Sequence, residues 1–224
     1  MRTGLFIILL SSVAASAAAQ TTVDHRVWGT AIFQGRFQPK SKWRWSVEGT
    51  IRSKNGVSDL DTIIAPRALV GYDLTPKLSV WGGYGEITKF TNGVRAHEHR
   101  YTEQLTWTVP AAMGTFAFRT RVEQRDINGN DGVAVRVREQ ARYSRPFRAK
   151  SPFSIVGYEE IFLHANATAK YARGFDQNRA FAGIGRAIGS RGRLEMGYLN
   201  NYGRTVGKPN FMYHVLSTTL TVNF

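Results

Sequence analysis

Hydrophobic and polar residues alternate one by one along most of this chain. In residues 43–52, Trp, Val, Gly and Ile at odd positions alternate with Arg, Ser, Glu and Thr at even positions. Residues 115–125 and 133–143 repeat the pattern with arginines on the polar side. A period of two is typical of β-strands, whereas an amphipathic helix repeats about every 3.6 residues. The chain is therefore predicted to be all-β.

Turn signals divide the alternating pattern into candidate strands. Asn-Gly pairs and other polar loops recur at a pitch of about 37 residues, which fits two membrane-length strands, one loop and one tighter turn. The loops are expected at one rim and most turns at the other. The candidate strands cover residues 27–38, 43–53, 62–74, 78–91, 98–109, 115–127, 133–143, 153–165, 177–188, 193–202 and 211–224.

These segments make an odd number of strands, whereas bacterial single-chain barrels have even numbers. Two corrections of the count are open at this point. Either the segment that starts at residue 27 is not a full wall strand, which gives ten strands, or residues 20–26 add a short strand, which gives twelve. The prediction is a closed antiparallel up-and-down barrel of about 10 to 12 strands.

Alternation alone does not say which face points outward, because a water-soluble barrel or sandwich buries its apolar face. Three observations favour a transmembrane barrel with the apolar face outward. The chain ends in an alternating strand closed by Phe224, which is similar to the assembly signal of bacterial outer-membrane barrels. Aromatic residues gather near strand ends, as interfacial girdles require. Loops are longer than turns, as in membrane barrels with short periplasmic turns.

Residues 1–19 have the features of a secretory signal peptide: Arg2, an apolar stretch and a run of alanines before Gln20. We therefore expect a signal peptide at 1–19, a single barrel domain at 20–224 and a bacterial outer-membrane location. The expected partners are outer-membrane lipid, lipopolysaccharide and, through Phe224, the barrel-assembly machinery. The formal charge of +14 makes a small anionic solute a further candidate partner, while export excludes nucleic acid. Cysteine is absent, so no disulfide is expected.

If lipid lies outside, the polar faces line the lumen with more arginines than carboxylates. The residues predicted to line it are Arg119, Arg121, Glu123, Arg125, Arg136, Arg138, Arg142, Arg179 and Glu195. Around the loop at Asn128, we expect Arg125 opposite Arg136 and an ion pair between Glu123 and its opposite residue, Arg138. Glu103 and Glu139 fall on apolar faces, and we expect them near the rims, where a carboxylate costs little.

Three classes of function are compatible with this lumen. Arginines and glutamates could fill it as a structural network, or leave a narrow pore that attracts anions. A lipid-modifying enzyme would need a nucleophile beside a histidine, and the rim residues His97 and His99 have no adjacent serine. The same histidines match no standard zinc pattern, so no metal and no cofactor are expected. Basic loop residues could instead bind lipopolysaccharide phosphates. We expect a structural or pore role and no enzyme activity.

The stretch from Gly174 to Arg179, GFDQNR, is followed by Gly183 and by LEMGY at residues 194–198. With Trp28, the strand that begins at Trp43, the His99-Arg100 strand entry and the Arg-x-Arg motif at 119–121, these residues resemble the bacterial domain-of-unknown-function family 2490. The resemblance covers nearly all of the chain after residue 19 and implies an outer-membrane-barrel-like protein without a known catalytic residue. Within it, Asp176 and Arg179 are expected to form a pair at the rim that fixes the loop before residue 177.

Overall fold

The computed structural model describes residues 21–91 and 94–224, and the predicted signal peptide lies outside these ranges. All the regular elements that it describes are β-strands, eleven in number, and no described residues form a helix long and apolar enough to cross a membrane. The strands are β1 (Thr21–Arg36), β2 (Trp43–Lys54), β3 (Asp59–Thr75), β4 (Leu78–Thr91), β5 (Val94–Ala111), β6 (Gly114–Ile127), β7 (Ala134–Pro146), β8 (Phe153–His164), β9 (Gly174–Ile188), β10 (Gly192–Gly203) and β11 (Asn210–Asn223).

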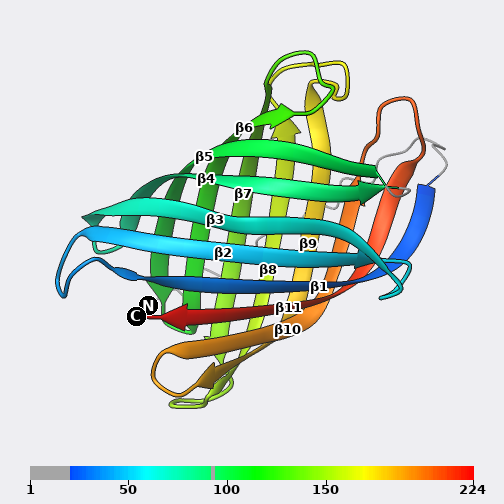
Figure 1. Ribbon diagram of the computed structural model, residues 1–224. Coiled ribbons are helices and arrows are strands. Elements are labelled where there is room, and N and C mark those ends of the chain that lie inside the picture. The colour runs from blue at the N-terminus through cyan, green and yellow to red at the C-terminus, as the bar shows by residue number, and fades with distance from the viewer. Residues whose placement is uncertain (1–20, 92–93) are drawn as a thin grey trace, which may run out of the picture.

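The strands form a closed barrel in chain order, and β1 closes the ring against β11 (Figure 1). Every pair of consecutive strands is antiparallel, whereas β1 and β11 are parallel from Thr21 opposite Asn210 to Gln34 opposite Asn223. The prediction of a closed, all-β barrel is confirmed. Both corrections of the strand count, to ten and to twelve, were wrong, and so was the expectation that every pair is antiparallel.

The parallel seam follows from the strand count. In a ring of alternating strands with an odd number, the first and last strands run in the same direction, so that only a parallel pair can close it. The first strand starts at Thr21 rather than at residue 27, and residues 21–26 extend β1 instead of forming a separate strand. This extension lets β1 pair with β11 over nearly its whole length.

The two longest turns have the same construction. In residues 37–42, the Phe37 amide donates to the carbonyl of Trp43, and the Trp43 amide donates to the Ser41 hydroxyl. Residues 147–152 repeat both bonds, with Phe147, Phe153 and Ser151 in these positions. Lys40 and Lys150 take the left-handed conformation at the same position of each turn. These turns lie at one end of the barrel with residues 76–77, 112–113 and 189–191, and the polar loops lie at the other end.

The outer face of the barrel is mostly apolar. Exposed aliphatic and aromatic side chains cover it around the ring, including Ile51, Val70, Leu105, Phe118, Ile155, Ile184 and Leu216. Near the turn end, Trp43 packs edge-on to Tyr72, Trp45 packs against Phe224, and Phe116 packs against Tyr143. Ring pairs of this kind are typical of the aromatic girdles that flank an apolar band.

A few carboxylates interrupt this outer face. Glu103 and Glu139 both point outward, and each lies in the middle of its strand, so the expectation that they sit near the rims was wrong. Glu139 accepts a hydrogen bond from Thr120 Oγ1 at 2.8 Å, and Glu159 accepts one from Asn178 Nδ2 at 3.0 Å. Two of the three carboxylates are therefore satisfied by a neighbour on the adjacent strand.

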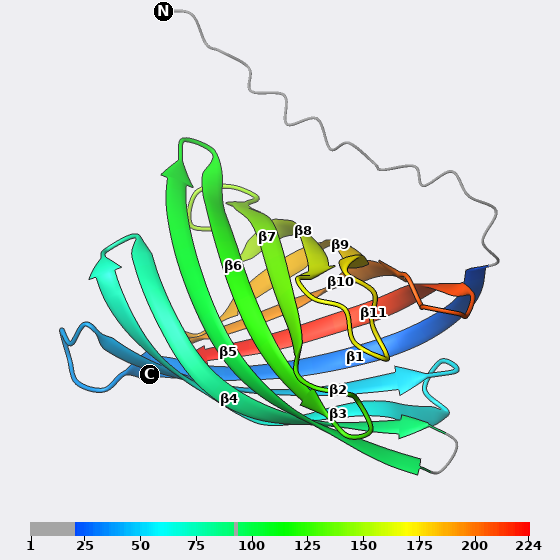
Figure 2. The ribbon, with the colours of Figure 1, turned by 90° about the horizontal axis from the view of Figure 1, so that it is seen from above.

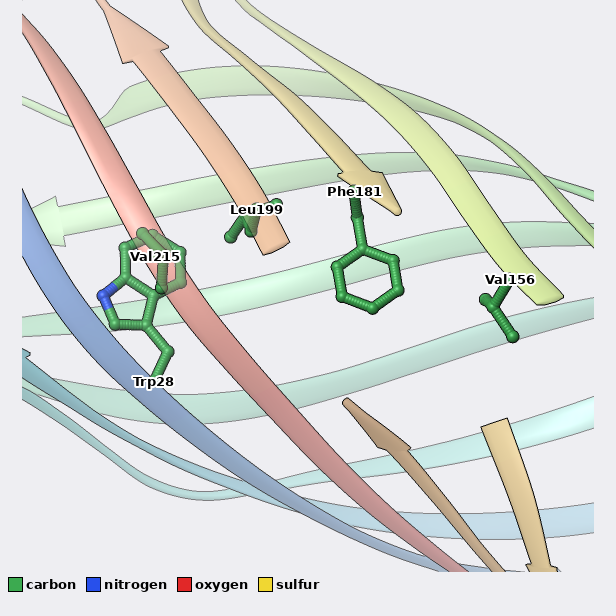
Figure 3. Close-up of a cluster of buried hydrophobic side chains, with 5 residues drawn as sticks. All are labelled: Trp28, Val156, Phe181, Leu199 and Val215. Carbon is green, nitrogen blue, oxygen red and sulfur yellow. The ribbon is translucent and has the colours of Figure 1, made fainter. Parts of the chain in front are cut away.

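Aliphatic and aromatic residues form one part of the inner wall. Figure 3 shows the cluster, which runs across neighbouring strands and consists of Trp28, Val156, Phe181, Leu199 and Val215. Tyr158 and Tyr213 pack against it. Seen from above, the curved wall of β4 to β7 faces β9 to β11 and β1 across the interior (Figure 2). The members of the cluster on β10, β11 and β1 thus lie across the interior from the arginine-rich strands β6 and β7, whereas β8 and β9 also carry members of the cluster.

The arginine-lined interior as candidate functional site

Side chains of β6 and β7 decide which face of the sheet points inward. Arg121, Glu123 and Arg125 alternate with outward residues along β6, and Arg136 and Arg138 do the same along β7. All five are nearly inaccessible to solvent, whereas Phe118, on the other face of β6, is 38% exposed. The arginines therefore lie inside the barrel and the apolar residues outside.

Glu123 is the centre of the largest ion-pair network. Its carboxylate is fully buried and accepts from Arg136 Nη2 at 2.6 Å and from Arg138 Nη1 at 2.7 Å. Arg100 Nη1 lies 3.3 Å away, and Arg67 Nη1 lies 3.8 Å away. Four guanidinium groups from β3, β5 and β7 therefore share one carboxylate, which links strands that are not neighbours in the sheet.

Three further carboxylates extend this network. Glu98 binds Arg100 and accepts from Arg125 Nε at 2.8 Å. Glu160 accepts from Arg119 at 2.7 Å and from Arg138 at 2.8 Å, and Asp176 accepts from Arg136 at 3.0 Å. Charge-assisted bonds of this kind are stronger than neutral ones, and the planar guanidinium can serve two carboxylates at once. The network therefore ties β5, β6, β7, β8 and β9 together across the interior.

A separate, smaller group of ion pairs lies near the turn end. Glu195 Oε1 accepts from Arg142 Nη2 at 2.5 Å and from Arg193 Nε at 2.6 Å. These side chains are partly exposed, with 12% for Glu195 and 32% for Arg193. Ion pairs in such surroundings contribute less than buried ones because water screens them.

Some interior arginines have no carboxylate partner among the described residues. Arg121 donates only to Gln104 Oε1, and Arg179 donates to the amide oxygens of Asn201 and Gln177. Arg52 forms no hydrogen bond and no ion pair with any described residue. The interior therefore carries an uncompensated positive charge, in agreement with the surplus of basic residues in the sequence.

Aromatic rings hold several of these guanidinium groups. Arg136, Arg138 and Arg179 lie over the ring of Phe162, with their Cζ atoms 5.0, 4.4 and 4.5 Å from its centroid. Phe162 itself is fully buried. The face of an aromatic ring attracts a cation, most strongly where both are removed from water. Phe162 therefore positions three arginines that would otherwise repel one another.

One cavity of about 740 Å³ runs through the interior. Its lining extends from Arg204 and Val206 in the loop 204–209 to Arg193 and Asn223 near the turns, so that it reaches toward both ends of the barrel. The wall formed by β1, β2 and β11 carries many hydroxyl groups, including Thr30, Thr50, Ser217, Thr219 and Thr221, together with the charged side chains of Arg26, Glu48 and Arg52. The opposite wall is the arginine network.

The loop 165–173 folds over the loop end of this cavity. Tyr171 stacks on His164 and accepts a hydrogen bond from Arg125 Nη2 at 3.1 Å. Burial acts to raise the pKa of the Tyr171 hydroxyl, but the positive charges of Arg125 and Lys89 outweigh it, and the pKa lies below its ordinary value. The loop is also fixed to residues 128–133, because Lys170 Nζ donates to the carbonyl of Asn128 at 2.6 Å.

The structure places the predicted lumen residues as follows. Glu123 lies fully buried within the ion-pair network, and the others line the cavity: Arg119, Arg121, Arg125, Arg136, Arg138, Arg142, Arg179 and Glu195. The predicted hairpin register was wrong by two residues, because Arg136 lies opposite Glu123 and Arg138 lies opposite Arg121. Glu123 and Arg138 nevertheless form an ion pair, as diagonal neighbours.

The predicted rim residues are distributed differently from the expectation. Asp176 is buried and binds Arg136 and His164, while Arg179 binds neutral amides, so the predicted Asp176–Arg179 pair was wrong. His97 and His99 point outward near the loop end of β5, where His97 Nδ1 lies 2.8 Å from Glu86 and His99 Nδ1 lies 2.6 Å from the Tyr84 hydroxyl.

Sequence reasoning missed Glu98 and Arg100. Only their neighbours His97 and His99 were singled out, as rim residues, whereas both missed residues are buried members of the network. The period of two could have identified them, because it places Glu98 and Arg100 on the face opposite to His97 and His99. No group of three His, Cys, Asp or Glu side chains that could hold a metal ion occurs in residues 21–91 and 94–224.

Comparison with known proteins gives the family and no activity. The model of a protein family described as "Protein of unknown function (DUF2490)" matches residues 25–212. The chain belongs to this family. The chain is also similar to an uncharacterized protein of Methylorubrum extorquens, with 31% identity over 223 residues that cover 97% of this chain and 95% of the relative. No solved structure matches the chain. The function of this DUF2490 protein therefore has to be inferred from the residues and the cavity inside the barrel.

Proposed function

We propose that this DUF2490 protein is an outer-membrane β-barrel that lets small anionic solutes pass in preference to cations. The observation that carries the proposal is the cavity of about 740 Å³, which reaches toward both ends of the barrel and has arginines along one wall. A narrow lumen with an excess of fixed positive charge attracts anions and repels cations. The wall of β1, β2 and β11 does not cancel that charge, because it adds Arg26 and Arg52 against the single carboxylate of Glu48.

The outer face supports the membrane part of the proposal. Exposed aliphatic side chains cover most strands, and aromatic pairs gather near the turn end. A water-soluble protein rarely exposes so large an apolar surface. Outer-membrane lipid is the partner that fits this surface. Export by the segment 1–19, contact of basic loop residues such as Arg95 and Arg204 with lipopolysaccharide, and recognition of β11 and Phe224 by the barrel-assembly machinery belong to the same proposal.

A non-enzymatic role fits the surroundings of the rim histidines. Glu86 Oε1 and Thr88 Oγ1 both approach His97 at the same ring atom, Nδ1, at 2.8 and 3.4 Å. A relay from nucleophile to base to acid needs the two ring nitrogens separately, one for the nucleophile and one for the acid. The geometry at His97 therefore gives no support to a catalytic relay, and we propose no enzyme activity.

The test is a recording of single channels in a planar lipid bilayer under a gradient of potassium chloride. We expect channel events with a reversal potential that shows chloride to be more permeant than potassium. Arg204→Gln removes a charge from the cavity lining and should lower this preference, whereas Arg186→Gln, outside the cavity near the turn end, should leave it unchanged. Tyr171→Ala should raise the conductance, because it removes a ring from the covered end of the cavity.

Two results would contradict the proposal. The first is the absence of channel events from a protein whose heat-modifiable migration on a gel shows that it is folded. Such a protein would have a closed interior. A reversal potential that shows a preference for potassium would mean that the interior arginines do not control passage. In either case the barrel would retain a structural role, with the ion-pair network filling its interior.

A further inference from the structure

Two arginines without a carboxylate partner meet at one aromatic ring in the middle of the barrel. Arg52 lies directly opposite Trp28 in the pairing of β1 with β2, and Arg179 reaches the same ring from β9. Their Cζ atoms lie 4.3 and 5.0 Å from the centroid of the indole. All three side chains line the interior cavity.

The donors of this group are largely unused. Arg52 has no hydrogen-bond or ion-pair partner among the described residues, and its Nε is buried. Trp28 is 6% exposed, and its buried Nε1 also lacks a partner. Arg179 donates Nε to Asn201 Oδ1 at 3.0 Å and Nη2 to Gln177 Oε1 at 3.2 Å, which are neutral acceptors.

An unpaired cation in a poorly hydrated interior is costly unless an anion compensates it. Arg100, Arg125, Arg136 and Arg138 satisfy this requirement with Glu98, Glu123 and Glu160, whereas buried Arg121 donates to the neutral amide of Gln104. At Trp28 no described carboxylate forms an ion pair with Arg52 or Arg179, and Asp61 and Glu160 act on these two arginines only from a greater distance, while both guanidinium groups and the indole N–H line the cavity. A guanidinium fork matches the paired oxygens of a carboxylate or phosphate.

We propose that Trp28, Arg52 and Arg179 bind one oxyanion, the phosphate or carboxylate group of a small solute, at mid-height in the barrel. The indole holds both guanidinium groups by cation–π contact, and its N–H adds a further donor. The proposal deepens the proposed function and rests on it, because a solute reaches this site through the lumen. The proposed site also accounts for part of the surplus positive charge of the interior, since Arg52 and Arg179 are two of its unpaired arginines.

The test is a titration of the purified, detergent-solubilised protein with sodium phosphate at constant ionic strength, followed by tryptophan fluorescence and by isothermal calorimetry. We expect a saturable change of fluorescence that is absent in Trp28→Phe. Arg52→Met and Arg179→Met should each weaken phosphate binding by about tenfold or more, since a hydrogen bond to a charged group contributes about 1.5–3 kcal/mol. Arg186→Met is the matched control and should bind as the wild type does.

A parallel titration with sodium acetate distinguishes a phosphate site from a carboxylate site, and sodium chloride gives the response to a simple halide. Saturable binding with equal affinity in the wild type, Arg52→Met and Arg179→Met would overturn the proposal, as would the absence of any saturable response. Heat-modifiable migration shows that each variant is folded. Phosphate binding without channel events would overturn the proposed pore but support the oxyanion site. Channel events without saturable binding would support the pore but overturn the oxyanion site.

Discussion

The arginines around Glu123 and the arginines around Trp28 lie in the same interior and differ in what compensates them. Arg136 and Arg138 bind buried carboxylates, and Phe162 supports them from one side. Arg52 and Arg179 have an indole ring and neutral amides instead. The first group connects strands of the wall, while the second presents unused donors to the cavity. Residue type and burial alone therefore do not distinguish a structural arginine from one proposed to bind a solute. The distinction lies in whether a carboxylate of the protein pairs with the guanidinium group.

The largest expected effect is on the structural group. Glu123→Gln keeps the shape of the side chain but removes the charge shared by Arg67, Arg100, Arg136 and Arg138. Breaking a buried ion pair on one side costs about 3–5 kcal/mol, because it leaves uncompensated charge. Urea unfolding in detergent micelles should show a loss of this size. Glu139→Gln on the outer face is the control, and an equal loss there would contradict the assignment.

A double-mutant cycle separates the two groups more directly. Glu123→Gln and Arg138→Met should show a coupling free energy of about 1–3 kcal/mol, as directly bonded groups do. Arg52→Met and Arg179→Met should show no favourable coupling, because both are cations and neither bonds the other. The unfolding free energies of the four single and two double variants decide this. Favourable coupling between Arg52 and Arg179 would remove the distinction.

Substitution in the group around Trp28 should change the free energy of unfolding in the opposite direction. Arg52→Met replaces a buried cation without an ionic partner by an apolar side chain of similar length, and we expect the free energy of unfolding to rise by about 1 kcal/mol in phosphate-free buffer. Unfolding in urea with and without phosphate measures it. Phosphate should stabilise the wild type more than this variant at the same concentration, because the variant binds phosphate more weakly. A large loss of stability in phosphate-free buffer would instead place Arg52 in the structural group.

The smallest effect is expected at the turn end. Glu195→Gln removes the partner of Arg142 and Arg193, which are both partly exposed. Water can replace the lost contacts there, so the cost should be about 0.2–1 kcal/mol, well below that of Glu123→Gln. The same urea titration gives both values. A loss as large as that of Glu123→Gln would show that the turn-end pair also belongs to the buried network.

The alternation of the sequence was enough to predict the faces of the strands, because a period of two fixes which side chains share a side. It could not predict the register of the hairpin at Asn128, since a shift by two residues leaves every side chain on the same face. The local turn decides it: Asn130 bonds the carbonyl of Ile127 at 2.9 Å, and Gly129 and Gly132 take positive φ. Partners across the interior were equally inaccessible, and Asp176 was paired with the wrong arginine for this reason.

The two corrections of the strand count were wrong for a different reason. The sequence pattern contained all the strands, but a rule drawn from even-numbered bacterial barrels suggested adding or removing one. The structure keeps the odd number and changes the direction of one pair instead, with β1 parallel to β11. His25, which stacks on His214 of β11 across this seam, lies in the part of β1 that the predicted strand did not include.

The parallel seam also determines where the two ends of the barrel's chain emerge. Thr21 enters β1 beside Asn210 at the loop end, whereas the amide of Phe224 bonds the carbonyl of Gln34 at the turn end. An even-numbered barrel returns both ends to one side, but here the full height of the wall separates them. A short linker cannot join them, so circular permutation of this barrel is barred. In the proposed outer-membrane location, epitope tags placed before Thr21 and after Phe224 would lie on opposite sides of the membrane, so that antibody access in intact cells would reveal the barrel's orientation.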